Sequence, residues 1–508
     1  MRSPIICVVG QVNSGKTSFI SCIIEKKIGE ISNMTQDIIP YFINQAQLFH
    51  ITTCNKLLIP SMILIDTPGH EPFYNMRITG INVSDFVIVI IDVLNGLEGP
   101  TKAIIQYLIE NKKPFVLAIN KIDNINGWQQ ANVNSHRIQD VLRLQTDEVK
   151  LEYEIQMSKI IQSLLIEYGL SSELYYRNKE VNKCISLVPF SALSCVGVPD
   201  LLMFVGKCTE KYTNLITKTD LELFCYNTST DRNGFWLHCL LVQGDLNKKT
   251  KLLSLPDIKI LNIHSQQYKS NVQECSASDV VSLLIPKPKH LIVTNTYLNV
   301  LNSQSITIND NNENIGLTIH AKSMDHAQAI IFLMKKTTYI DAYRIVIGQL
   351  HKADYIKASS SINPYYRCIL SYTQSEKKEE YEDVKIMTAN NLYTLHQMYL
   401  DWLESERSKM AAVCQIEILS DHIFRKSDPI ICGVKVVSGK LKKGSELVGF
   451  GPVTSIQLNK INIDEAHMGY EVAIKIDTKQ SLEGISHLEC KGNPYEYYIN
   501  KILKVGVI

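Results

Sequence analysis

The chain has 508 residues, too many for one hydrophobic core, so its length predicts several domains. Hydrophobic residues make up 45% and charged residues 20% of the chain, which is typical of a soluble globular protein. Because 52 Lys and Arg balance 51 Asp and Glu, the net charge excludes a strong bulk attraction to nucleic acid or anionic lipid.

The cysteine and hydropathy patterns favour a cytoplasmic protein. The 13 cysteines stand singly, with no C-x-x-C pair, which predicts reduced thiols. The longest apolar runs, such as FVIVII at 86–91, are far shorter than the roughly 20 residues that cross a bilayer. A strand-like run begins almost at the N-terminus, so we expect no removable targeting peptide.

A phosphate-binding loop is predicted near the start of the chain. The apolar run IICVV at 5–9 is typical of a buried strand; GQVNSGKT at 10–17 follows it, and an apolar pattern with helical spacing comes next. This strand–loop–helix order supports a G-x-x-x-x-G-K-T phosphate loop, with Lys16 on the phosphates and the Thr17 hydroxyl on Mg²⁺. The candidate residues are Gly10, Asn13, Ser14, Gly15, Lys16, Thr17 and Ser18.

A second strand end supplies a further metal ligand. MILIDTPGH at 62–70 is an apolar strand that ends in Asp66, where a carboxylate can hold Mg²⁺ through water. The backbone N–H of Gly69 can then sense the γ-phosphate of a bound nucleotide.

Two more strand ends predict guanine as the base. FVLAINKID at 115–123 ends in Asn120, Lys121 and Asp123. The Asp123 carboxylate can accept hydrogen bonds from the N1 and N2 protons of guanine and would repel the acceptor edge of adenine. In VPFSALS, the residues at the base-covering position are Ser191, Ala192 and Leu193.

Two further residues suggest a hydrolytic switch. Thr35 lies in the polar segment GEISNMTQDIIPYF and can give Mg²⁺ a second hydroxyl when a γ-phosphate is present. His70 directly follows D-T-P-G, so its imidazole can orient an attacking water if an outside contact turns it inward. The alternatives are an ordinary surface threonine and a structural histidine.

With these motifs, the sequence resembles the translational GTPases through DTPGH at 66–70 and NKID at 120–123. In finer detail it resembles the family of eukaryotic and archaeal translation initiation factor 5B, relatives of bacterial initiation factor 2. The segments IPSMILIDTPGHEPFYNMRITG, VIVIIDVLNGLEGPT, KKPFVLAINKIDNINGW and VPFSALSCVGVPDLLMFV carry this resemblance. Asp92 and Trp128 are closer to the eukaryotic and archaeal branch than to the bacterial one.

The sequence departs from that family at two places. The family's phosphate loop usually reads G-H-V-D-x-G-K-T, whereas this chain has Gln11 and Asn13. An aspartate at the second position can help hold a monovalent cation, and the neutral Asn13 weakens that expectation. The segment after Thr35 also lacks the family's glycine and is about one residue shorter.

The resemblance and the residue patterns together predict a multidomain α/β fold. Short alternating strands from about residue 221, as in FWLHCLLVQGDLNKKTKLL, suit an antiparallel barrel. Alternating strand and helix patterns after the polar linker at 309–316 suit an α/β/α domain. The expected parts are a P-loop GTPase domain at 1–216, a β-barrel at 217–308, an α/β/α sandwich at 315–388, a connecting helix at 389–411 and a C-terminal β-barrel at 412–508.

The apolar residues of the predicted helix at 390–411 recur at three- and four-residue spacing. They are Leu392, Leu395, Tyr399, Trp402 and Leu403. A packed core helix and a long connecting helix both fit this pattern, and the resemblance favours the second.

The resemblance implies a ribosome-dependent GTPase that promotes joining of the ribosomal subunits with initiator Met-tRNA. It implies GTP and Mg²⁺ as ligands and contacts with large-subunit RNA and the small subunit. It also implies that the C-terminal barrel holds the aminoacyl end of the tRNA and that residues 495–508 dock initiation factor 1A. We expect a monomer off the ribosome and no membrane partner.

Three alternatives remain open. The chain could be a GTP-sensing scaffold on the ribosome with negligible hydrolysis, or an organellar or bacterial-type initiation factor. The absent transit peptide, Asp92 and Trp128 disfavour the organellar and bacterial types. The last barrel could also be a spacer, since residues 412–508 carry 12 Lys and Arg against 11 Asp and Glu.

Overall fold

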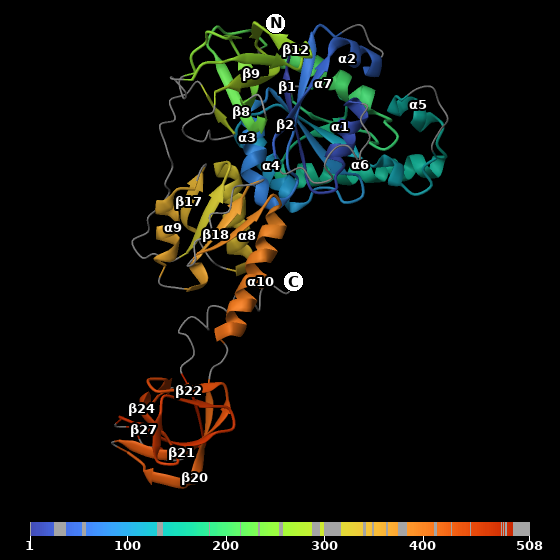
Figure 1. The fold of residues 1–508 in the computed structure, drawn as a ribbon. Helices are drawn as coiled ribbons and strands as arrows, with labels where there is room; N and C mark the ends of the chain where they lie inside the picture. The colour runs from blue at the N-terminus through green and yellow to red at the C-terminus, as the bar shows by residue number, and fades with distance from the viewer. Residues whose placement is uncertain are drawn as a thin grey trace. The chain divides into compact units, whose positions relative to one another are not determined.

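A computed structural model gives the fold (Figure 1). The structure describes residues 2–24, 37–52, 57–129, 136–181, 183–213, 215–231, 234–252, 258–286, 295–298, 316–338, 342–347, 350–361, 364–373, 384–410, 414–427, 429–447, 449–478, 480, 482 and 485–490. Several separate sheets with helices confirm the multidomain α/β class.

The chain divides into two compact units. Residues 1–307, 320–330 and 345–350 form one unit, and residues 308–319, 331–344 and 351–508 form the other. The finer division into five parts stays a prediction.

A seven-stranded sheet forms the N-terminal part of the first unit, in the order β2-β3-β1-β4-β5-β7-β6 (Figure 1). Strand β2 pairs antiparallel with β3, and the other pairs are parallel. The strands are β1 (Ile5–Gly10), β2 (Ile39–Asn44), β3 (Ser61–Asp66), β4 (Phe86–Asp92), β5 (Phe115–Asn120), β6 (Ser172–Leu174) and β7 (Ile185–Pro189).

Helices cover both faces of this sheet. They are α1 (Lys16–Ile24), α2 (Gln45–Thr52), α3 (Tyr74–Val83), α4 (Gly99–Glu110), α5 (Ile138–Arg143), α6 (Asp147–Tyr168) and α7 (Val198–Tyr212). Residues of α1 and α7 pack in one apolar cluster, and residues of α3, α4 and α6 pack in another. Because both faces are covered, β1, β3 and β4 are buried along their whole lengths, which explains their unbroken apolar runs.

An antiparallel β structure follows in the same unit. A six-stranded sheet runs in the order β12-β11-β14-β9-β8-β15, and β10 pairs with β13. Its alternating inward residues form one apolar core. The strands are β8 (Glu222–Asp231), β9 (Gly234–Gln243), β10 (Asp245–Asn247), β11 (Asn262–Ser265), β12 (Ser270–Val272), β13 (Glu274–Ser276), β14 (Asp279–Ile285) and β15 (Thr296–Tyr297).

A four-stranded sheet in the order β17-β16-β18-β19 lies in the next stretch of chain. Its elements are β16 (Leu317–Ala321), α8 (Met324–Thr338), β17 (Ala342–Ile347), α9 (Lys352–Ser359), β18 (Cys368–Tyr372), β19 (Lys385–Ala389) and α10 (Leu392–Met410). Leu395, Tyr399 and Leu403 of α10 are fully buried. The first half of this helix is therefore packed core, and its connecting role stays a prediction.

The last described part is a second antiparallel β structure with its own core. Its main path is β23-β24-β27-β21-β20-β28; β25 pairs with β24, and β22 pairs with β26. The strands are β20 (Gln415–Arg425), β21 (Ile430–Ser438), β22 (Lys440–Lys442), β23 (Glu446–Leu447), β24 (Gly451–Leu458), β25 (Ile461–Ile463), β26 (Glu465–His467), β27 (Glu471–Ile476) and β28 (His487–Glu489). The proposed factor-docking segment at 495–508 lies outside the described residues.

Within the described ranges, none of the helices is long and apolar enough to cross a membrane.

Candidate functional site

The motif residues lie where strands of the central parallel sheet end. Asp66 pairs in register with Val8, and Asn120 pairs with Asp92. The carboxyl ends of β1, β3, β5 and β7 therefore meet at one edge of the sheet, which is the usual ligand-binding edge of such folds.

The phosphate loop is closed by its own lysine. The ammonium group of Lys16 donates to the carbonyl oxygens of Gly10, at 2.8 Å, and Gln11, at 2.6 Å. Ser14 Oγ also donates to the Gln11 carbonyl, at 2.9 Å. Burial lowers the pKa of Lys16 to about 8, partly offset by the nearby Asp66 carboxylate. The lysine is thus mostly charged at neutral pH and lies inside a loop suited to an anion.

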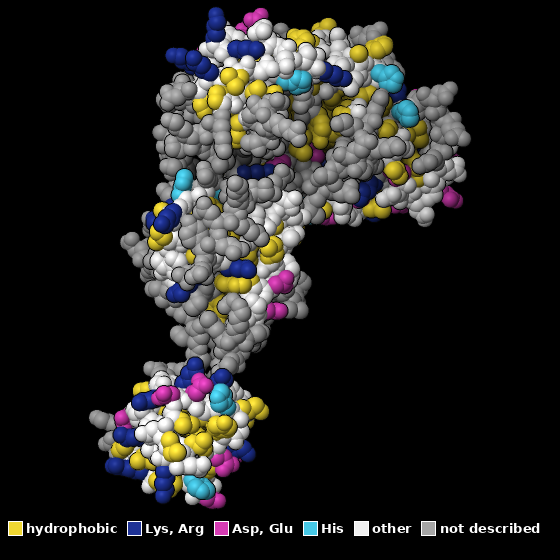
Figure 2. All heavy atoms as spheres, viewed as in Figure 1, with side chains coloured by type: hydrophobic (Ala, Val, Ile, Leu, Met, Phe, Trp, Pro, Cys, Tyr) yellow, Lys and Arg dark blue, Asp and Glu magenta, His cyan; other side chains and the backbone are white. Residues whose placement is uncertain are grey.

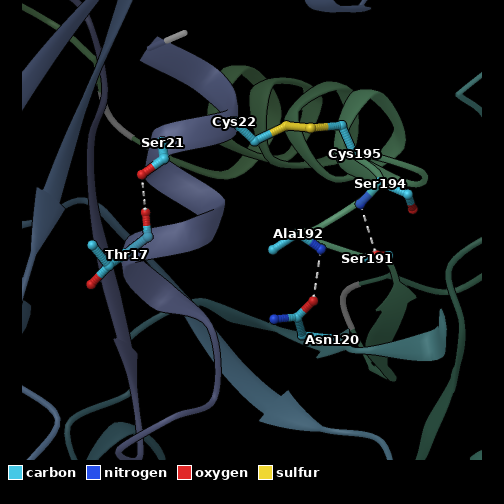
Figure 3. The surroundings of a disulfide bond; sticks show 8 residues. All are labelled: Thr17, Ser21, Cys22, Asn120, Ser191, Ala192, Ser194 and Cys195. Carbon is cyan, nitrogen blue, oxygen red and sulfur yellow. Dashed lines mark hydrogen bonds between the residues drawn. A yellow bond between two sulfur atoms is a disulfide. The ribbon is translucent and has the colours of Figure 1, made fainter. Parts of the chain in front are cut away.

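One buried amide joins the phosphate loop to the loop that would cover the base. Figure 3 shows its bond to Ala192. Asn120 is 1% exposed; its Nδ2 donates to the Ser14 carbonyl at 2.7 Å, and its Oδ1 accepts from the Ala192 N–H at 2.9 Å. Gly15 has a φ of +91°, and a Cβ there would collide with the Asn120 amide. A side chain at position 15 would therefore push the two loops apart.

Asp123, the residue predicted to select guanine, carries a buried acceptor. It lies in the 3₁₀ turn η3 (Ile122–Asn124), and its Oδ1 is buried without a hydrogen-bond partner among the residues that the structure describes. A buried acceptor without a partner costs about 1–3 kcal/mol, so this position fits a ligand that donates. The neighbouring Lys121 has a φ of +65° and pairs with Asp92 at 2.8 Å.

The base-covering loop is held by its own hydrogen bonds. The N–H of Ser191 donates to the Val196 carbonyl at 2.8 Å, and Ser191 Oγ accepts from the Ser194 N–H at 3.1 Å. Ser191 and Ala192 are buried, whereas Leu193 is 70% exposed. Leu193 is therefore mostly exposed to solvent, unlike the other two candidate residues of this loop.

The D-T-P-G loop approaches the phosphate loop through a glycine. A Cβ on Gly69 would lie 2.5 Å from the Lys16 ammonium nitrogen and 3.1 Å from the Gln11 carbonyl oxygen. A side chain at position 69 would therefore displace the Lys16 ammonium group and crowd the backbone of the phosphate loop, so the glycine lets the two loops lie close together.

The predicted metal ligands come from separate elements. Thr17 lies on the first turn of α1, half-buried, and the 1%-exposed Asp66 ends β3. Thr35 lies outside the described residues, so its predicted role is neither supported nor opposed. A hydroxyl and a carboxylate are oxygen ligands that suit Mg²⁺, which usually takes few ligands from protein and the rest from phosphates and water. Within the described ranges there is no group of three His, Cys, Asp or Glu that could hold a metal alone.

The two departures in the phosphate loop have different surroundings. Gln11 is buried, and its Oε1 accepts from Thr101 Oγ1 of α4 at 3.3 Å. Asn13 is exposed with a φ of +61°, a conformation that asparagine adopts readily. Ser18 is half-buried on α1. Asn13 therefore keeps the loop backbone without the charge of an aspartate, and the monovalent cation stays untested.

Arg77 is a site residue that sequence reasoning missed. Its side chain on α3 is 2% exposed and donates from Nη1 to the carbonyl oxygens of Pro68, at 3.0 Å, and His70, at 2.7 Å. His70 begins the turn η2 (Glu71–Phe73). Its pKa is lowered by burial and by the positive charges of Lys16 and Arg77. An arginine on the helix that follows D-T-P-G-H was the available signal.

We expect Arg77→Met to destabilise the protein by about 2–4 kcal/mol, because it removes a buried guanidinium and leaves the buried Pro68 carbonyl oxygen without that donor. Urea unfolding of the parent and the variant measures this difference. Arg143→Met, at a side chain that is 79% exposed on α5, is the matched control and should change little. A loss below about 0.5 kcal/mol for Arg77→Met would show that water replaces the guanidinium.

Comparison with known proteins shows which proteins this chain is similar to. Residues 1–211 match the elongation factor Tu GTP binding domain, and residues 413–484 match elongation factor Tu domain 4. Human eukaryotic translation initiation factor 5B is 28% identical in an alignment 538 positions long that covers 94% of this chain and 44% of the human protein. The chain is similar to translation initiation factor 5B over most of its length.

Archaeal proteins show a similar degree of likeness. The probable translation initiation factor IF-2 of Methanococcus maripaludis is 28% identical over 94% of this chain and 90% of its own length. The crystal structure of GDP-bound aIF5B from Aeropyrum pernix has the same fold, with a TM-score of 0.55, 22% identity and coverage of 99% of this chain and 97% of that one. The chain thus spans less than half of the human factor and most of the archaeal one.

The expectation that the cysteines are reduced thiols is wrong at one pair. Cys22 and Cys195 form a disulfide, although their positions gave no paired spacing (Figure 3). The fold brings α1 and the base-covering loop together, so the Cα atoms of residues 173 positions apart lie within 6.3 Å. The other ten described cysteines are free thiols.

Proposed function

We propose that the chain is a ribosome-dependent GTPase of translation initiation that promotes joining of the ribosomal subunits with initiator Met-tRNA. The observation that carries the nucleotide assignment is the buried, unpartnered acceptor of Asp123 beside the Asn120 bridge. Homology over 94% of the chain supports the role in initiation.

Each residue of the site has a distinct task in this proposal. Lys16 and the backbone N–H groups of the phosphate loop bind the phosphates, while Asp123 accepts the N1 and N2 protons of guanine. His70 orients the attacking water once large-subunit RNA turns its ring inward. Arg77 fixes the backbone from which His70 projects, through its bond to the His70 carbonyl.

Mg²⁺ fits the oxygen ligands available in this site. Thr17 and Asp66 would hold it, and Thr35 would join them when a γ-phosphate is present. When bound, Mg²⁺ neutralises the charge that develops on the phosphate oxygens during transfer.

The C-terminal barrel is proposed to bind the aminoacyl end of initiator tRNA. Figure 2 shows basic, acidic and hydrophobic side chains intermixed on the visible face of this part. Residues 412–508 carry 12 basic and 11 acidic residues, so their net charge gives little electrostatic attraction to a phosphate backbone. A pocket for one methionyl ester needs little charge. Residues 495–508 are proposed to dock initiation factor 1A.

Protection of the methionyl ester tests the tRNA role. We expect the full chain to slow spontaneous hydrolysis of initiator Met-tRNA, measured by acid-precipitable labelled methionine. The protection should weaken only modestly between 50 and 200 mM salt, because few phosphates are neutralised. Unchanged hydrolysis would assign the barrel the role of a spacer.

Single-turnover GTP cleavage with and without 80S ribosomes tests the function as a whole. We expect slow cleavage by the chain alone and a stimulation of at least about tenfold by ribosomes, since water positioning of this kind contributes roughly 10²–10⁴-fold. Tight GTP binding without stimulation would instead identify a GTP-sensing scaffold and overturn the hydrolytic proposal.

A further inference from the structure

The disulfide connects the two halves of the proposed nucleotide site (Figure 3). Cys22 lies on α1, whose first residues are Lys16 and Thr17 of the phosphate loop. Cys195 lies in the loop that carries Ala192. Their Cα separation of 6.3 Å falls within the range of roughly 4.4–6.8 Å that a disulfide spans.

Both cysteines are open to exchange with small thiols. Each is only partly buried, at the border of the apolar cluster that α1 and α7 share. By contrast, Cys7 and Cys208 in the same part of the chain are buried, and burial raises the pKa of Cys208 to about 12. Solvent access and a preformed partner thus distinguish Cys22 and Cys195 from these inert thiols.

The disulfide restrains the same gap that Asn120 bridges by hydrogen bonds. Asn120 ties the Ser14 carbonyl to the Ala192 N–H across the site. Within the base-covering loop, Ser191 bonds to both Ser194 and Val196, and these bonds brace the segment between Ala192 and Cys195. A covalent link at Cys195 therefore holds Ala192 in place even when the Asn120 bonds break.

We propose that Cys22 and Cys195 form a reversible thiol–disulfide switch that controls nucleotide release. The disulfide form keeps the base-covering loop against α1 and retains the nucleotide, whereas the dithiol form lets the loop open. The identity of the released ligand as a guanine nucleotide rests on the proposed function.

The exchange balances with a low-molecular-weight disulfide such as oxidised glutathione. One cysteine thiolate attacks a sulfur of that disulfide, forms a mixed disulfide and displaces one glutathione thiolate. The second cysteine thiolate then attacks the protein sulfur of the mixed disulfide and displaces the second. Two electrons pass from the protein dithiol to the glutathione disulfide, and the two protein protons end on the two glutathiones.

Peptide mapping tests the bond without reference to any nucleotide. The full-length chain is equilibrated with mixtures of reduced and oxidised glutathione, trapped with iodoacetamide and digested. We expect a peptide linked through Cys22 and Cys195 that disappears as reduced glutathione rises, and that persists in the control variant Cys184→Ser. Absence of this linked peptide at every ratio would overturn the switch.

Nucleotide dissociation tests the consequence. We expect fluorescent GDP to leave the oxidised chain at least about fivefold more slowly than the chain reduced with dithiothreitol, because loop opening is restrained by a covalent link. Cys22→Ser and Cys195→Ser should each remove this difference, and Cys184→Ser should keep it. If the reduced chain binds GDP and both forms release it equally fast, only this inference is overturned. If neither form binds GDP, the proposed function is overturned as well, while the peptide map still reports the disulfide.

Discussion

Asp123→Asn is expected to lower the affinity for GTP by at least about a hundredfold and to raise the affinity for XTP. The exchange replaces one of two carboxylate acceptors with a donor. Guanine presents two donors at this edge, whereas xanthine carries an oxygen at C2 that can accept. Since Asp123 Oδ1 is buried without a protein partner in the described ranges, no neighbouring group shares this task. Titration with fluorescent GTP and XTP measures the change.

Asp147→Asn is the matched control for this exchange. Asp147 begins α6 with a fully solvated carboxylate and carries the same chemical change away from the site. It should leave both affinities unchanged. Equal GTP affinity for the parent and Asp123→Asn would mean that another group selects the base.

His70→Ala is expected to reduce ribosome-stimulated GTP cleavage by at least about tenfold, toward the range of roughly 10²–10⁴ for a general catalytic group. GTP affinity should stay near that of the parent, because Lys16 and the phosphate loop remain intact. Single-turnover cleavage and equilibrium titration separate the two effects. The exposed His50 on α2 offers a control, since His50→Ala should alter neither quantity. Undiminished cleavage by His70→Ala would assign water positioning to another residue.

The pH dependence of GTP cleavage should follow the protonation of the His70 imidazole. Burial and the charges of Lys16 and Arg77 lower the pKa of His70 below its ordinary value of 6.5. The neutral imidazole that can accept from water therefore persists to lower pH than in a free histidine. We expect stimulated cleavage to hold steady as pH falls through 6.5 and to decline only below it. In His70→Ala this decline should be absent from the residual rate.

Contiguous patterns made much of the N-terminal fold predictable. Each motif directly follows an apolar run, and parallel strands place their carboxyl ends at one edge of a sheet. The sequence therefore indicated that Lys16, Asp66 and Asn120 would meet, although they lie as much as 104 positions apart. The antiparallel strands after residue 221 could also be predicted, because turn residues fall between runs of alternating apolar residues.

Contacts that depend on how loops fold back could not be predicted. In the sequence, Arg77 is one polar residue of a predicted helix. Only the turn at 71–73 brings its guanidinium within hydrogen-bond distance of the Pro68 and His70 carbonyl oxygens. Gln11 replaces the histidine that is usual in the similar family, and the sequence did not show that its amide oxygen accepts a hydrogen bond from Thr101. Cys22 and Cys195 have no shared motif, and only the packing of α1 beside the base-covering loop pairs them.

Because Asn120 bonds to both loops, assembly of the site and selection of the base depend on different residues. Asn120 joins the two loops of the site by hydrogen bonds, while Asp123, three positions later, is proposed to select the base. Joining of the two loops and selection of the base thus depend on different positions of one short segment. A lineage could change its nucleotide preference by one codon at position 123 and keep a folded site throughout. Position 120 offers no such freedom, since aspartate lacks the donor that Ser14 requires and alanine lacks both bonds. We therefore expect substitutions at position 123 to change nucleotide preference while the protein stays folded, and most substitutions at position 120 to disrupt the site. Saturation mutagenesis of both positions would measure this difference.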